Sequence, residues 1–125
     1  MSSVLVIDDD TTILEVVEAI LAKKNYTTYR AQTTSEAYHI LETQPIDLIL
    51  LDIILPGQGG MEFLMELKEK HPGIPVIIMS GKVRTDTSPF KHLALQFGAH
   101  CILSKPFTVE ELLKAVEVAL RGTCN

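Results

Sequence analysis

Short apolar runs recur along the chain and alternate with longer segments that mix apolar and polar residues. Four of these runs contain almost only apolar residues, as parallel strands do when helices cover both faces of their sheet. They are residues 4–7, 46–51, 76–79 and 101–103. A further run, residues 27–30, is β-prone but half polar, and we therefore expect it at an edge of the sheet.

In the intervening segments, apolar residues recur every three or four positions, which is the spacing of one buried face of a helix. Each of the following sets predicts one helix: Ile13, Val16, Val17, Ile20 and Leu21; Ala37, Ile40 and Leu41; Met61, Leu64 and Leu67; Phe90, Leu93, Ala94 and Phe97; Val109, Leu112, Leu113, Val116 and Leu120. Strands that alternate with helices in this way indicate an α/β domain with a parallel sheet.

Three of the predicted helices have recognisable starts. Thr33 with Glu36, and Thr108 with Glu111, have the spacing of a capping box, in which a hydroxyl and a carboxylate satisfy amides of the first turn. Asp10 precedes the first predicted helix and is expected to cap it, with Thr11 or Thr12 as the alternative cap.

Size and composition narrow the class of protein. With 125 residues and no linker or repeat, we expect residues 1–125 to form a single domain without an effector domain. The net charge of −5 and the absence of a basic cluster argue against direct nucleic-acid binding. No apolar run is long enough to cross a membrane, and the start lacks a basic signal region, so we expect a cytoplasmic protein without membrane contact.

The two cysteines do not have the spacing of a zinc site or a disulfide framework. Cys101 lies in an apolar run and Cys124 lies in a polar stretch after the last predicted helix. We therefore expect one core thiol and one tail thiol.

Carboxylates stand where two of the apolar runs end. Asp8, Asp9 and Asp10 follow the first run, and Asp52 closes the run at 46–51. The carboxyl ends of parallel strands form the ligand-binding edge of such sheets. Several carboxylates gathered there repel one another unless a cation neutralises them, and hard oxygen ligands favour Mg²⁺, Mn²⁺ or Ca²⁺ over zinc.

Two further polar residues occupy equivalent places. Ser80 ends the run at 76–79, and Lys105 follows the run at 101–103. The predicted sheet edge therefore combines carboxylates, a hydroxyl and an ammonium, a set suited to a phosphoryl group held with a divalent metal.

Four motifs occur in order along the chain: IDDD, LLDIILPGQGG, MSG and LSKPF. They make the chain similar to the receiver domain of two-component response regulators over nearly its whole length. The resemblance implies a flavodoxin-like, doubly wound (βα)5 fold whose five-stranded parallel sheet has the order 2-1-3-4-5. It also implies a phosphoacceptor switch that undergoes no enzymatic turnover.

By this resemblance, Mg²⁺ is the expected cofactor, and Mn²⁺ is expected to substitute for it. Asp9, Asp52 and the main-chain carbonyl of Ile54 are expected to ligate the metal directly. Asp8 is expected to act through a bound water.

The resemblance also assigns the phosphoryl chemistry. Asp52 is the expected phosphoacceptor and takes the group from a phosphohistidine. Lys105 and Ser80 are expected to contact the phosphoryl oxygens, and the bond between Lys105 and Pro106 is expected to be cis. The implied partners are a sensor histidine kinase or phosphotransfer protein and a downstream effector domain or protein, with homodimerisation on phosphorylation left open.

The sequence departs from the family pattern in four places. Ile102 stands where receivers usually have an aromatic switch residue, so activation is expected to act through displacement of the loop after the fourth strand instead of a ring movement. Gly59 replaces a common aspartate cap. The segment after Ser80 is longer than usual, and we expect residues 82–87 to lead into a helix that starts near Ser88. Ile54 offers no hydrogen bond to an attacking water, which predicts slow self-dephosphorylation.

Three other classes of protein share features with this sequence. A phosphatase of the haloacid dehalogenase type needs an acid two residues after the nucleophile, where Ile54 stands. A flavin-binding protein needs a phosphate loop after the first strand, where the IDDD carboxylates would repel a phosphate. A degenerate receiver that binds partners without phosphorylation is the alternative that Ile102 keeps open.

Overall fold

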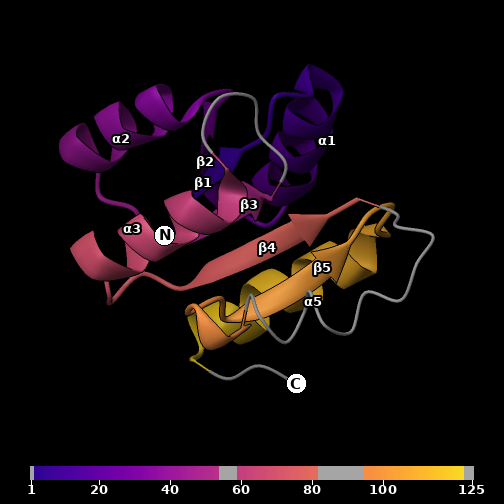
Figure 1. Cartoon of the computed structure of the whole chain (residues 1–125). Coiled ribbons are helices and arrows are strands. Elements are labelled where there is room, and N and C mark those ends of the chain that lie inside the picture. The colour runs from indigo at the N-terminus through magenta and orange to yellow at the C-terminus, as the bar shows by residue number, and fades with distance from the viewer. Residues whose placement is uncertain (1, 54–58, 82–94, 123–125) are drawn as a thin grey trace.

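The computed structural model describes residues 2–53, 59–81 and 95–122. Five strands form one parallel sheet in the order β2-β1-β3-β4-β5, as expected (Figure 1). They are β1 (Ser3–Ile7), β2 (Thr27–Ala31), β3 (Leu48–Asp52), β4 (Val76–Ser80) and β5 (Cys101–Ser104). The half-polar strand β2 lies at an edge, which confirms the prediction from its composition.

Helices cover both faces of the sheet. The described residues include α1 (Thr11–Ala22), α2 (Thr34–Thr43), α3 (Gly60–Lys70) and α5 (Val109–Leu120). One core cluster joins α2 and α3 to one face, and a second joins α1 and α5 to the other. The apolar residues of β1 and β3 alternate between these clusters and are fully buried, which explains why their sequences show unbroken apolar runs.

The third strand begins later than expected and ends on the carboxylate. Ile46 remains in the core at 9% exposure, but the pairing starts at Leu48 and includes Asp52. Asp47, directly before β3, is bonded to the first residue of β1. Its main-chain N donates to Ser3 O, and its Oδ2 accepts from Ser3 N at 2.8 Å.

The helix starts follow the sequence with one correction. Asp10 caps α1 through its Oδ1, and Thr108 and Glu111 form a complete capping box on α5. On α2, Thr33 Oγ1 accepts from the main chain of Glu36, as expected. The carboxylate of Glu36, however, accepts from Gln32 N, one residue before the cap, and so the predicted reciprocal bond is wrong.

In the part of the chain that the structure describes, two predicted core positions of the helices face solvent. Val16 is 44% exposed, because Leu14, Val17 and Leu21 form the stripe that faces the sheet and position 16 is turned away from it. Val109, in the first turn of α5, is 51% exposed. Phe63 is fully buried on α3, although it was not in the predicted stripe.

Cys101 is buried at 8% exposure, but its sulfur is disulfide-bonded, so the expectation of a core thiol there is wrong. Cys124 lies outside the described residues, as do residues 82–87 and Ser88, where the fourth helix was expected to begin. Within the described ranges, none of the helices has the length and apolar character needed to cross a membrane.

Candidate functional site

The parallel register brings four strand ends to one edge of the sheet. Ile7 lies opposite Leu51, Asp52 opposite Met79, and Ser80 opposite Ser104. The residues at or just beyond these ends are therefore neighbours in space although they are far apart in sequence. They are Asp8, Asp52, Ser80 and Lys105.

Three carboxylates form what we call the acid cluster, which consists of Asp8, Asp9 and Asp52. Each offers an oxygen that lies within 4.8 Å of the others. Asp8 is fully buried and Asp52 is 7% exposed, whereas Asp9 is exposed. Carboxylates this close to one another, two of them buried, repel one another unless a cation neutralises their charge.

Lys105 supplies one positive charge to the acid cluster. Its Nζ lies 2.6 Å from Asp8 Oδ2 and 3.6 Å from Asp52 Oδ2. Its main-chain N donates to Ser80 O at 2.6 Å, which places it directly beyond the β4–β5 pairing. The peptide bond to Pro106 is cis, as expected from the resemblance.

Asp8 is held on both carboxylate oxygens. Oδ2 accepts from Lys105, and Oδ1 accepts from the main-chain N of Asp10 at 2.9 Å. Asp10 in turn caps α1, so Asp8 links the sheet edge to the start of this helix. Among the described residues, the three carboxylates of the acid cluster therefore face one ammonium. The negative charge that this ammonium does not offset favours binding of a further cation.

Ser80 is 6% exposed at the end of β4, and its Oγ donates to the neighbouring Gly81 O at 3.3 Å. Ile102 lies opposite Ile78 in the β4–β5 pairing and packs against the core cluster beneath α2 and α3. Ile54, the expected carbonyl ligand, lies outside the described residues.

One contact at the site was missed by the sequence analysis. Gln32, which follows β2, donates from Nε2 to the main-chain O of Asp9 at 3.5 Å. Gln32 directly follows the edge strand β2, so it lies at the same end of the sheet as the carboxylates. This position in the sequence is the signal from which its place near the site could have been predicted.

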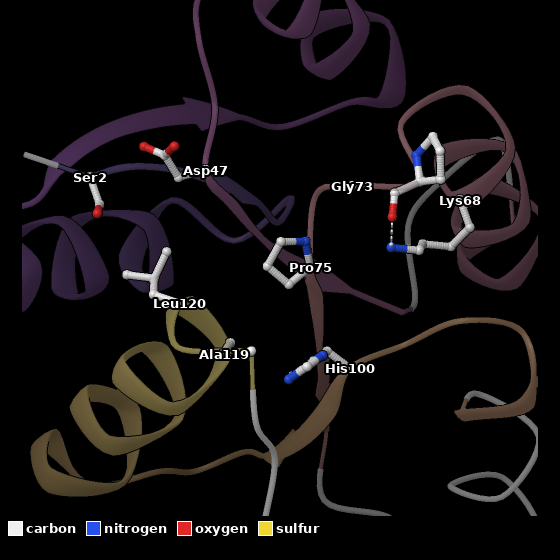
Figure 2. Close-up of a pocket in the computed structure, with 10 residues that line it drawn as sticks. Ser2, Asp47, Lys68, Gly73, Pro75, His100, Ala119 and Leu120 are labelled. Atoms are coloured by element: carbon white, nitrogen blue, oxygen red, sulfur yellow. Dashed lines mark hydrogen bonds between the residues drawn. The ribbon is translucent and has the colours of Figure 1, made fainter.

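A cavity of about 470 Å³ lies at the amino ends of the strands, opposite the end that carries the acid cluster (Figure 2). Its charged groups are engaged by the protein itself: Lys68 Nζ donates to Pro72 O and Ile74 O, and Asp47 accepts from Ser3 N. Burial lowers the pKa of Lys68. The Lys68 bonds brace the turn between α3 and β4, the Asp47 bond joins the starts of β1 and β3, and neither involves the acid cluster.

The fold and the site together define a doubly wound α/β domain with an acid cluster and a lysine at the carboxyl edge of its sheet. The sequence model described as the response regulator receiver domain matches residues 4–117, so the chain belongs to this family. Membership supports a phosphoacceptor role in two-component signal transduction.

Individual relatives agree with this assignment. The chain is 36% identical over 118 residues to the regulatory protein VanR of Enterococcus faecium, covering 94% of this chain and 49% of VanR. The CheY-like receiver domain protein of Methanospirillum hungatei is 29% identical with a TM-score of 0.88, covering 98% of this chain and 95% of that one. The receiver domain of NtrX from Brucella abortus is 32% identical with a TM-score of 0.84, covering 96% and 99%.

Some relatives are much longer than the matched region. The chain spans about half of VanR, with 49% covered, and 28% of a longer NtrX chain from Brucella abortus. The part that they share with this chain is therefore the receiver domain.

Proposed function

We propose that Asp52 accepts a phosphoryl group from the phosphohistidine of a sensor histidine kinase or phosphotransfer protein, in a Mg²⁺-dependent reaction. The observation that carries this proposal is the acid cluster, whose oxygens lie within 4.8 Å of one another beside Lys105 Nζ. The chain then acts as a switch for an effector domain or protein and does not turn over a substrate.

The donor set fits magnesium. Asp9 and Asp52 would hold the ion directly, with the carbonyl of Ile54, while Asp8 would act through a water because both of its oxygens already accept hydrogen bonds. Magnesium favours few protein carboxylates and keeps several waters. When bound, it supplies positive charge that offsets the carboxylates and the phosphoryl oxygens. Mn²⁺ offers the same preference for oxygen ligands and is proposed as a substitute.

The side chains have distinct roles in the transfer. An oxygen of Asp52 attacks phosphorus, the bond from phosphorus to the imidazole nitrogen breaks, and its electron pair stays with the imidazole. Lys105 Nζ, 3.6 Å from Asp52 Oδ2, pairs with the incoming phosphoryl oxygens. Ser80 Oγ exchanges its bond to Gly81 O for one to the phosphoryl group.

The response to phosphorylation is proposed to differ from the usual aromatic movement. Ile102 has neither a ring nor a hydroxyl, and it is partly buried against the core between the sheet and α2 and α3. We therefore propose that phosphorylation acts through Ser80 and displaces the segment after it. Homodimerisation of the phosphorylated chain is one proposed result of this change.

Incubation with acetyl phosphate and Mg²⁺ tests the proposal. The intact mass is expected to show one added phosphoryl group, and the Asp52→Asn variant is expected to show none, because an amide cannot form the acyl phosphate. A phosphoryl group on the variant as well would place the chemistry on another residue. No phosphorylation of either protein would favour the degenerate receiver that binds partners without being modified.

The phosphorylated chain is expected to lose its phosphoryl group slowly. The side chain of Ile54 offers no hydrogen bond to an attacking water, so hydrolysis is expected to take minutes or longer. The intact mass, followed after removal of the donor, measures this rate. Ile54→Gln restores a hydrogen-bonding side chain and is expected to hydrolyse faster, whereas loss within seconds from the unmodified sequence would contradict the prediction.

A further inference from the structure

Gln32 extends the pairing between β1 and β2 by one residue. The register ends with Ile7 opposite Ala31, and the main-chain N of Asp8 then donates to Ala31 O at 3.0 Å. At the next position the bond comes from a side chain and not from the main chain: Gln32 Nε2 donates to the carbonyl oxygen of Asp9 at 3.5 Å. Gln32 therefore contacts the loop at an expected ligand of the metal.

The backbone of Gln32 is itself fixed. Its main-chain N donates to Glu36 Oε1 at 2.7 Å, and Glu36 N donates to Thr33 Oγ1 at 3.1 Å. Both bonds belong to the first turn of α2, so the amide side chain extends from a braced position. The departure of Glu36 from the expected capping box is what provides this brace.

Asp9 is the member of the acid cluster that gains most from such support. Asp8 and Asp52 are buried in the sheet edge, whereas Asp9 is exposed and lies in the connection to α1. An exposed loop residue must be ordered before it ligates an ion, and that ordering opposes binding.

We propose that Gln32 is a positioning residue for Asp9, which holds the loop so that the carboxylate stays within the acid cluster. A neutral amide suits this task, since a lysine or arginine would compete with the metal and a glutamate would add to the repulsion. The inference rests on the proposed function, because it concerns the metal that phosphorylation of Asp52 needs.

The test compares Mg²⁺ affinity in Gln32→Met, which keeps the side-chain length but removes the donor, with Gln96→Met as a matched control. Gln96 is an exposed glutamine in the segment that leads to the opposite end of β5. The dissociation constant, measured from amide NMR shifts during a MgCl₂ titration of the full chain, is expected to rise about threefold in Gln32→Met. The urea midpoint of Gln32→Met is expected to stay unchanged, and Gln96→Met is expected to keep the Mg²⁺ affinity, the urea midpoint and the phosphorylation rate of the unmodified chain.

Each outcome separates the two proposals. Equal Mg²⁺ affinity in Gln32→Met, Gln96→Met and the unmodified chain would overturn the positioning role and leave the proposed function standing. A fall in affinity that is matched by a fall in the urea midpoint would also overturn it, since the effect would then be one of folding. If the unmodified chain did not bind Mg²⁺, the proposed function would fail and the inference with it.

Discussion

Replacing Lys105 with methionine is expected to lower the free energy of unfolding by about 3 kcal/mol in metal-free buffer. The ammonium lies 2.6 Å from Asp8, which is fully buried, and 3.6 Å from Asp52. Methionine keeps much of the side-chain volume but leaves these carboxylates facing one another without a cation. Urea unfolding in the presence of a chelator measures the effect.

Two comparisons separate this charge effect from lost packing. Lys114 is exposed on α5, so Lys114→Met is expected to change stability by less than about 0.5 kcal/mol. Adding Asp8→Asn to Lys105→Met removes one of the facing charges and is expected to recover part of the loss. If Lys105→Met were as stable as Lys114→Met, the ammonium would not be the cation that holds the acid cluster together.

Replacing Gly60 with alanine is expected to destabilise the chain by about 3 kcal/mol or more. A Cβ at this position would lie 1.9 Å from Ile53 O and 2.5 Å from Ile53 C. These are backbone atoms directly after Asp52, and so the start of α3 or the end of β3 must move. The variant is also expected to bind Mg²⁺ more weakly, because Asp52 moves with this backbone; urea unfolding and a MgCl₂ titration measure the two effects.

Gly73→Ala is the matched control, because a Cβ there meets no atom within 4 Å. Its stability is expected to equal that of the unmodified chain or to exceed it slightly, since alanine restricts the unfolded state more than glycine does. Equal stability of Gly60→Ala and Gly73→Ala would mean that α3 does not pack against Ile53 as the structure shows.

Most of the fold was predictable because the two-sided burial of the sheet leaves a strong pattern. Unbroken apolar runs identified β1, β3, β4 and β5, and the half-polar composition of β2 predicted its place at an edge. The strand order itself came from the resemblance to receivers, since apolar runs alone do not specify which strands are neighbours.

The meeting of Asp8, Asp52, Ser80 and Lys105 was predictable for a related reason. Parallel strands end at a common edge, so residues that close such strands meet whatever their separation in sequence. The distances could not be predicted, because they depend on side-chain conformations within the cluster.

The misses have local physical causes. Val16 has the right spacing for a helical stripe, but Leu14, which was not predicted, is buried beside Val17 in its place. Spacing alone does not select which of two adjacent stripes is buried. The bond from Gln32 to Asp9 joins two connections at the same sheet edge, and no periodic pattern records such a contact.

The stoichiometry of phosphorylation as a function of Mg²⁺ concentration tests the central claim most directly, with acetyl phosphate as the donor and intact mass as the readout. If the acid cluster holds the metal beside Asp52, one phosphoryl group per chain is expected at saturating Mg²⁺, and none is expected in excess chelator. Equal phosphorylation of Asp52 with and without the metal would contradict the account.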